Sequence, residues 1–483
     1  MQRTFITRIV YYLEPCIKSL GAIYLIYAIF AVIWRFVGGL VSSFVNSFTV
    51  FVVFLILILC TQSMFRKFTP IPNHLSARII SLLNRFSLWH LVVMGLAIRL
   101  VWGMATETAV VSDGLSYFNH AKNMVLHGYY GFDGGESEAH WPPGYPLILS
   151  PFMMLFGANT LAVQALNFIL FLVTLLGVWK LSKFYYGETI AKMAIVLLIF
   201  WPNYIYLINM SAKETVILTF ISWFAYFYFT FSETNRYHYA FITGLILGIM
   251  TLVQPSIAVI AAAAVITHFV STRRLMPSVA LSVIIIVGVI VTVSPWTVRN
   301  YLLLGSPVAV SYNGGDVFYR ANNANAIPGY NAPDPNSPTY HLAPLEKRAK
   351  SYELGIQWIK EHPMDFLNLA YGKGLLYLGN DDTTLWQFFE KDENSRRSIV
   401  YYALHLISNF YWIMILVFLL YRIYLSKAEL DSFDHFVALA FIMMGLVEFV
   451  FEAGARHHIP LYPLMAIACA KTLLSDHKLV EDR

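Results

Sequence analysis

The chain has few charged residues and few cysteines for its length. Only 13% of its 483 residues are charged, about half the share found in ordinary soluble domains. Hydrophobic residues make up 58% and aromatic residues 16%. The three cysteines, Cys16, Cys60 and Cys469, fall in or beside apolar runs, so no extracytoplasmic disulfide is expected. The shortage of charge excludes an ordinary soluble protein and indicates a polytopic membrane protein.

The sequence shows no internal repeat, and no cleavable signal peptide is expected. The first apolar run is long and has no small-residue cleavage site, which favours a first membrane span over a removable leader. Transporters commonly carry repeats and interrupted helices with polar residues at mid-membrane, so the lack of repeats disfavours a transporter or flippase. The net charge of +5 is explained by lysine and arginine residues that orient the chain in the membrane. No nucleic-acid partner is expected.

Long apolar runs fill most of the sequence. Runs of about 20 residues are long enough to cross the hydrocarbon core. Twelve such runs lie near residues 19–38, 44–62, 87–105, 160–182, 192–208, 212–231, 239–253, 255–270, 277–297, 400–421, 435–452 and 458–475. The short pair around Gln254 and Pro255 is either two spans that meet in a tight turn or one broken helix. The sequence therefore predicts an all-α polytopic membrane protein with about 12 transmembrane helices.

The distribution of lysine and arginine predicts the orientation of these spans. Cytoplasmic loops hold the excess of these residues. With the N-terminus inside, the inner segments hold 18 of them, and the short outer loops hold only Lys122, Lys213 and Arg456. The 298–400 segment is too long for this rule. Both termini are therefore predicted to be cytoplasmic.

Residues 106–159 form a large outer loop with candidate chemistry. Asp113 precedes an amphipathic run, so a helix should start there and hold this carboxylate beside an apolar surface. Asp113 or Ser112 could instead serve only as a helix N-cap. The segment from Trp141 to Pro146 contains three prolines and predicts a rigid loop, followed by a short interfacial helix over residues 147–156. Its aromatic residues either anchor at the headgroup level or contact a ligand.

Cationic residues occur at the other predicted outer boundaries. Lys213 and Glu214 either form a snorkelling pair or bind a phosphate and a sugar hydroxyl. Arg299 leaves the predicted ninth span on the outer side, and Tyr312 follows as a further substrate-binding candidate. Arg99 lies inside an apolar run, where an ionisable residue forms a structural ion pair or contributes to a site.

The last outer loop contains Arg456 and two adjacent histidines, His457 and His458. Adjacent helical side chains point in different directions, and no acid-rich histidine cluster accompanies them, so a metal site is disfavoured. Arginine matches phosphate oxygens in a bidentate manner. Arg456 and His457 are therefore predicted to contact a phosphate.

The predicted organisation has three parts. Residues 1–297 form an N-terminal transmembrane module with the 106–159 loop, residues 298–400 form a small mixed extracytoplasmic lid, and residues 401–483 form C-terminal transmembrane helices. Within the lid, the sequence predicts a strand-like run over 305–315 and a helix over 345–360 that His362 and Pro363 end.

The candidate residues make one chemical set. A carboxylate at the membrane boundary can take a proton from an incoming hydroxyl, and nearby cations can stabilise charge on a departing phosphate. The segments SDGLSYFNHAKNMVLHGYYG, WPPGYPL, SAKET, SPWTVRNYLLLGSPVAVSYNGG, ELGIQWIKEHPMDFLNLAYGKG and the ARHHIPLYPLMA stretch resemble GT-C glycosyltransferases. The resemblance is strongest to the bacterial branch that includes relatives of protein O-mannosyltransferases and the lipid A aminoarabinose transferase.

The resemblance implies an inverting transfer of a sugar from a polyprenyl-phosphate donor to a glycan, lipid or protein acceptor. It places the reaction on the extracytoplasmic face of a bacterial inner membrane. The alternative function is a transporter or flippase of lipid-linked sugars, which the lack of repeats disfavours. Asp113 matches the family's catalytic base, and Arg299, Arg456 and Lys213 match its donor-phosphate contacts more weakly. A second acid of the first loop is expected among Asp133, Glu136 and Glu138. No cofactor is required, although some members of the family bind a divalent metal.

Overall fold

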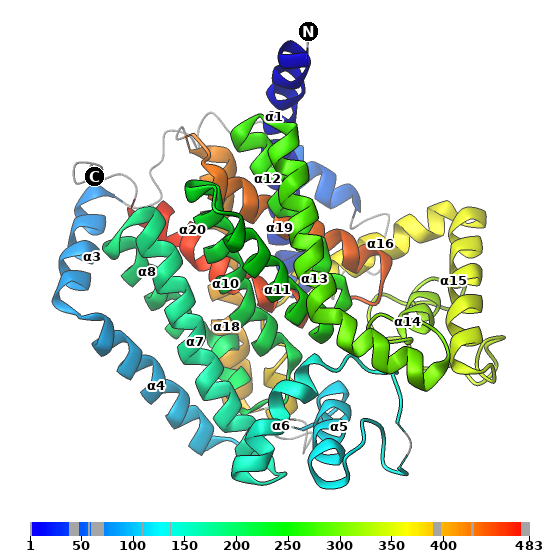
Figure 1. The fold of residues 1–483 in the computed structure, drawn as a ribbon. Coiled ribbons are helices and arrows are strands. Elements are labelled where there is room, and N and C mark those ends of the chain that lie inside the picture. Colours follow the sequence, from blue (N-terminus) through cyan, green and yellow to red (C-terminus); the bar gives the residue numbers. More distant parts are fainter. Residues whose placement is uncertain are drawn as a thin grey trace.

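The computed structural model describes residues 2–37, 48–56, 58, 72–108, 110–135, 137–389, 398–426 and 429–474. These residues form helices joined by loops, with no β-strand among them (Figure 1). The helices are α1 (Gln2–Val37), α3 (Asn73–Arg85), α4 (Leu88–Ala105), α5 (Asp113–His127), α6 (Gly144–Phe156), α7 (Thr160–Tyr186), α8 (Glu188–Ile199), α9 (Pro202–Tyr206), η2 (Leu207–Asn209), α10 (Lys213–Thr234), α11 (Tyr237–Val253), η3 (Pro255–Val259), α12 (Ile260–Thr272), α13 (Leu275–Leu304), α14 (Gly314–Arg320), α15 (Pro344–Glu361), α16 (Pro363–Leu378), η4 (Leu385–Phe388), α18 (Ile399–Leu420), η5 (Tyr421–Leu425), α19 (Ser432–Val450), η6 (Ala455–Leu461) and α20 (Tyr462–Leu474).

Within the described residues, eight helices are long and apolar enough to cross a membrane, or up to nine if one bent pair forms a single span. These helices make the chain an integral membrane protein. The predicted count of twelve is not reached, because α11 is shorter than a full span and α20 has only 13 residues. The predicted 192–208 span is two helices that bend by 66° between Ile199 and Pro202, where the proline cannot continue the helix. Of the predicted 44–62 span, residues 48–56 and 58 are described and are helical, and the rest lies outside the described residues.

Helix α19 runs between two polar clusters, one at each of its ends. At its start, Asp434 accepts hydrogen bonds from Arg422 of η5 (3.1 Å) and Lys471 of α20 (2.8 Å). Tyr186, the last residue of α7, donates to Asp431 (2.9 Å) beside them. At its other end, Glu448 contacts the 451–461 segment. Because a 19-residue helix is roughly 28 Å long, these two polar clusters mark opposite ends of the bundle.

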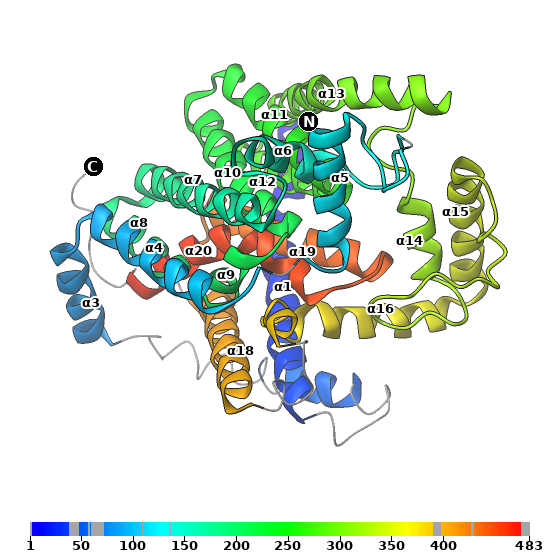
Figure 2. The same ribbon diagram turned by 90° about the horizontal axis from the view of Figure 1, so that it is seen from below.

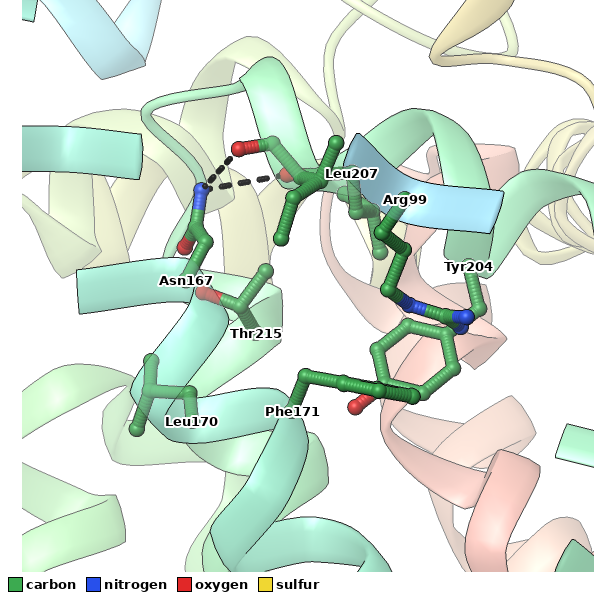
Figure 3. Close-up of a pocket in the computed structure, with 8 residues that line it drawn as sticks. Arg99, Asn167, Leu170, Phe171, Tyr204, Leu207 and Thr215 are labelled. Atoms are coloured by element: carbon green, nitrogen blue, oxygen red, sulfur yellow. Dashed lines mark hydrogen bonds between the residues drawn. The ribbon is translucent and has the colours of Figure 1, made fainter. Parts of the chain in front are cut away.

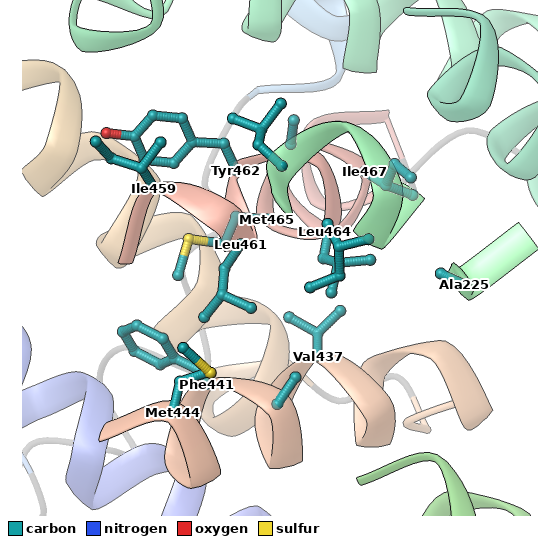
Figure 4. Close-up of a cluster of buried hydrophobic side chains, with 14 of the residues drawn as sticks. Ala225, Val437, Phe441, Met444, Ile459, Leu461, Tyr462, Leu464, Met465 and Ile467 are labelled. Carbon is teal, nitrogen blue, oxygen red and sulfur yellow. The ribbon is translucent and has the colours of Figure 1, made fainter. Parts of the chain in front are cut away.

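The centre of the bundle is α20, in which every residue is buried. It packs against α8, α10, α18 and α19, and Figure 4 shows its apolar side chains facing those of α10 and α19. The small residues Ala466, Ala468 and Ala470 allow close approach of neighbouring backbones, which favours helix association in a membrane. The described cysteines Cys16 and Cys469 are both free thiols.

Residues 305–313 correct the prediction of a strand. Here the backbone bonds to side chains of α13 instead of to a second strand. Asn300 donates to the carbonyl of Val308 (2.9 Å), and Trp296 donates to that of Val310 (2.8 Å). The N–H of Tyr312 then bonds to the carbonyl of Ala139 (2.9 Å). The segment therefore fastens the 129–141 loop to the end of α13.

The helices that follow partly match the sequence prediction. The helix expected over 345–360 is α15, and His362 ends it as expected. Helices α14 and α15 pack together at the side of the bundle, near the end of α13 (Figures 1 and 2). The interfacial segment expected from residue 147 starts earlier, because α6 begins at Gly144. Pro146 is tolerated there since N–H groups in the first turn have no partner within the helix.

Candidate active site

Asp113 is the first residue of α5, as the sequence predicts. The preceding residue, Ser112, has a left-handed φ of 53° and makes no side-chain capping bond. The carboxylate of Asp113 forms an ion pair with Arg456, 343 residues later in the chain. Capping is therefore not the main role of Asp113.

The start of α5 lies directly against the segment that leads into α10. The hydroxyl of Ser211 donates to the carbonyl of Gly114 (2.9 Å). A Cβ atom on Gly114 would lie 2.2 Å from the carbonyl oxygen of Ser211. Only glycine permits this approach, which brings Asp113 near the first residues of α10.

Arg456 joins two carboxylates from different helices. Besides Asp113, its Nε lies 3.4 Å from Oε1 of Glu214, whose side chain is only 2% exposed. Burial alone would lower the pKa of Arg456, but the carboxylates of Glu214 and Asp113 raise it above its ordinary value. Glu214 thus pairs with Arg456, and the snorkelling pair with Lys213 is not formed.

Asp113 is ionised at neutral pH. Burial alone would raise its pKa, but the charges of Arg456 and Lys213 outweigh burial, so the pKa lies below its ordinary value. His457 acts in the same direction. Lys213 makes no hydrogen bond or ion pair with any described residue, although it lies close enough to influence Asp113. It is therefore a cation whose charge is available to a ligand.

His457 brings a further acid into this cluster. Its Nδ1 lies 2.7 Å from Oε2 of Glu448, in the last turn of α19. Glu448 is not among the residues predicted from the sequence. A signal was present, because an acid within an apolar run is a functional candidate by default.

Arg299 and Tyr312 lie in a neighbouring cluster and do not contact Asp113. Arg299 donates to the carbonyl of Glu138 (2.5 Å), and its guanidinium carbon lies 4.5 Å from the ring centroid of Trp296. Burial and the nearby charge of Glu138 raise the pKa of Tyr312 to about 12. Arg299 therefore does not join the ion pairs of Asp113 as predicted. Its guanidinium group is hydrogen-bonded to the 129–141 loop instead.

The candidate second acids differ in their surroundings. Glu138 forms an ion pair with the fully buried His120 at 2.6 Å, and Asp133 accepts a hydrogen bond from Asn123 at 3.1 Å. Glu136 lies outside the described residues. Glu138 and Asp133 both hold the first loop in place, and neither contacts Asp113.

Arg99 is predicted either to form a structural ion pair or to contribute to the site, and the structure shows neither. It is fully buried and donates to the carbonyls of Leu198 and Ile199 at the end of α8. Its guanidinium carbon lies 3.7 Å from the ring centroid of Phe171, and no carboxylate among the described residues pairs with it. The negative end of the α8 dipole and the aromatic ring offset its charge. A small cavity beside it contains none of the predicted site residues; its lining comprises Arg99, Asn167, Leu170, Phe171, Tyr204, Leu207, Ile208 and Thr215 (Figure 3).

A buried polar network supports the helix that carries the site. Asp381 is fully buried and accepts hydrogen bonds from Trp201 (2.6 Å), Asn203 (2.9 Å) and Tyr462. It also pairs with His458 (3.0 Å), the residue after His457. This network, which the sequence analysis missed, fixes η6 and so the positions of Arg456 and His457.

No group of three or more histidine, cysteine, aspartate or glutamate residues within the described ranges could hold a metal ion. The described part of the site combines acids and cations that can exchange protons and bind an anion. The contacts of Asp113, Glu214 and Glu448 with the 451–461 segment place the site at one end of the bundle.

Comparison with known proteins gives one family match. Residues 140–298 match the family described as dolichyl-phosphate-mannose-protein mannosyltransferase, a GT-C family. The match confirms, for these residues, the resemblance to GT-C glycosyltransferases. It includes Lys213 and Glu214 but ends just before Arg299, and it does not include Asp113 or Arg456.

Solved structures with detectable similarity include two glycosyltransferases. ArnT from Cupriavidus metallidurans bound to undecaprenyl phosphate is 15% identical, with a TM-score of 0.41 over 80% of this chain and 77% of that chain. The Archaeoglobus fulgidus oligosaccharyltransferase in complex with Zn and sulfate is 14% identical, with a TM-score of 0.45 over 78% of this chain. This chain covers 48% of that second protein. No curated protein matches the sequence.

Proposed function

We propose that this chain is an inverting GT-C glycosyltransferase of the membrane. It transfers a sugar from a polyprenyl-phosphate donor to a hydroxyl of a glycan, lipid or protein acceptor. The observation that carries the proposal is the cluster in which Asp113 meets Arg456, with Lys213 and His457 close by. The family match over residues 140–298 supports the same reaction class.

In this proposal Asp113 is the base. Its low pKa ensures that it is ionised before the acceptor arrives, but the ion pair with Arg456 also weakens it as a base. Binding of the donor phosphate would restore the basicity of Asp113, because the phosphate competes with Asp113 for the N–H groups of Arg456. As Arg456 turns to the phosphate, Asp113 loses its counter-charge and its affinity for the proton of the acceptor hydroxyl increases.

Lys213 gives the donor phosphate its first contact. It stands at the start of α10, where unpaired N–H groups and the helix dipole also favour an anion. With Arg456 shared between two carboxylates, Lys213 is the cation that a phosphate meets without displacing another partner. Charge that develops on the departing phosphate is then shared by Lys213 and Arg456.

The site is proposed to face the extracytoplasmic side of a bacterial inner membrane, with both termini in the cytoplasm. Two features support this orientation. The excess of lysine and arginine falls on the side of the termini, and the cluster of Asp434 with Lys471 lies at the end of α19 opposite to Glu448. Reporter fusions after residues 106–112 and at the C-terminus should give opposite locations.

The proposal is tested by replacing Asp113 with asparagine in the full chain. Lipid-linked sugars and surface glycans of a deletion strain are compared with those of strains that carry wild-type, Asp113→Asn or Asp365→Asn protein. Asp365 is an exposed acid in the first turn of α16 and serves as the matched control. We expect the Asp113→Asn protein to leave the deletion phenotype unchanged and the control to restore transfer. Full transfer by the Asp113→Asn protein would refute the assignment of the base.

A further inference from the structure

Glu448 is a buried carboxylate at an unfavourable place. Its side chain is 3% exposed and lies in the last turn of α19, where the helix dipole disfavours negative charge. Its partners are Nδ1 of His457 (2.7 Å) and, more distantly, the N–H of Gly454 (3.4 Å). When Nδ1 of His457 carries the hydrogen, it donates to Oε2 of Glu448, because a carboxylate accepts hydrogen bonds.

The second ring nitrogen of His457 is left to exchange protons. Nε2 makes no hydrogen bond with any residue in the described ranges, and 17% of the side chain is exposed. The ring edge lies against Gly454, where an added Cβ atom would be 3.4 Å from Nε2 and 3.3 Å from Cε1. A histidine oriented through one nitrogen by a carboxylate is the arrangement that general acids and bases use.

Charged groups surround this pair on several elements. Asp113 of α5 lies within electrostatic range of His457, together with Arg456 and Lys213. Lys373 of α16 is influenced by Glu448 and Glu452, and Glu448 also acts electrostatically on Tyr24 and Tyr377. His457 therefore contacts Glu448 of α19 and lies within electrostatic range of Asp113 of α5.

The reaction proposed above releases a proton from the acceptor hydroxyl and creates a new proton acceptor on the departing phosphate. The bond between the sugar and the phosphate oxygen breaks, and that oxygen keeps the electron pair. The acceptor oxygen forms the new bond to the sugar, and its proton passes to Asp113. A phosphate monoester has a second pKa of about 6, so the leaving oxygen can accept a proton from a histidine.

We propose that Glu448 and His457 form the general acid for the departing polyprenyl phosphate. Nε2 of His457 gives its proton to the leaving oxygen, and Glu448 is the positioning residue that holds the ring. The proton on Asp113 later returns to His457 through water, which restores both groups. This inference rests on the proposed transferase function and assigns a separate residue to each of its two proton transfers.

The test measures binding and turnover against pH for the full chain in lipid nanodiscs. Binding of synthetic undecaprenyl phosphate is measured from pH 5.5 to 9 for the wild type, His457→Gln, Glu448→Gln and the exposed-histidine control His362→Gln. We expect wild-type and control affinity to fall at least tenfold more than that of His457→Gln across this range. Ionisation of the ligand is common to all four proteins and cancels in the comparison.

Turnover is measured with donor lipids extracted from the deletion strain. We expect the alkaline limb of the wild-type profile to disappear in His457→Gln, and turnover to fall in Glu448→Gln because the ring loses the carboxylate that positions it. If His457→Gln does not fold, Gly454→Ala provides the second variant, since its methyl group would lie 3.3 Å from Cε1 of His457. It should shift the ring by a few tenths of an ångström and lower turnover.

The two proposals fail in different ways. A parallel loss of affinity with pH in wild type and His457→Gln, or an unchanged alkaline limb, overturns the general acid and leaves Asp113 as the base. A wild-type protein that binds no undecaprenyl phosphate at any pH overturns both. If Asp113→Asn abolishes turnover while His457→Gln keeps the wild-type profile, only the role of the Glu448 and His457 pair is refuted.

Discussion

Replacement of Arg456 by Met should separate the structural role of the ion cluster from its catalytic role. Arg456 is the cation paired with both Asp113 and Glu214. Glu214 is 2% exposed, and its Oε1 has no hydrogen bond beyond the 3.4 Å ion pair. Loss of the arginine therefore leaves a buried carboxylate without compensation, which costs about 3 to 5 kcal/mol.

The double variant Arg456→Met with Glu214→Gln removes that cost. With the buried charge gone, it should recover most of the lost stability, so the two substitutions are strongly non-additive. Thermal unfolding of the full chain in detergent, followed by the loss of the monodisperse peak, measures both effects. Sugar transfer should stay low in both variants, because neither provides Arg456 for the donor phosphate.

Two outcomes would refute this reasoning. One is a stability loss of less than about 1 kcal/mol for Arg456→Met, a value typical of an exposed pair. The other is a double variant that is no more stable than the single one. Arg456→Lys provides an intermediate case, since lysine keeps the charge but cannot contact both carboxylates with a planar fork.

Two further predictions concern the surroundings of the cluster. Gly114→Ala should abolish transfer and lower stability, because its Cβ atom would lie 2.2 Å from the carbonyl oxygen of Ser211. The control Gly103→Ala should be tolerated, because the nearest neighbour of its Cβ atom would be 3.6 Å away. Equal stability of the two variants in detergent would contradict the close packing at Gly114. Burial raises the pKa of Glu452 to about 7 despite the nearby Arg320, so the folded state favours the protonated acid. That stabilisation is complete below the unfolded pKa near 4.5 and is lost as the pH rises through about 7, an effect on the order of 3 kcal/mol. Wild type should therefore lose stability between pH 5 and 8, and Glu452→Gln should lose much less; identical profiles would show that another group is responsible.

The amino-acid sequence by itself determined the class of the protein and several of its elements. Low charge and long apolar runs are local properties, so they identify membrane helices without knowledge of the fold. The start of α5 at Asp113 and the end of α15 before His362 follow from local signals too. The motifs also resemble those of GT-C glycosyltransferases, and the family match agrees with that resemblance for residues 140–298.

The tertiary structure alone decided which charges meet. Asp113 and Arg456 are 343 residues apart, and the sequence predicted only that both lie on one side. Arg299 shares that predicted side, yet it holds the 129–141 loop, because the direction of a long side chain depends on which carbonyl lies within its reach. Glu448 became a site residue since the chain turns back after α19 and places His457 beside it. The sequence shows which charged residue is present and roughly where it lies along a membrane span. Its partner depends on how helices that are distant along the chain pack together.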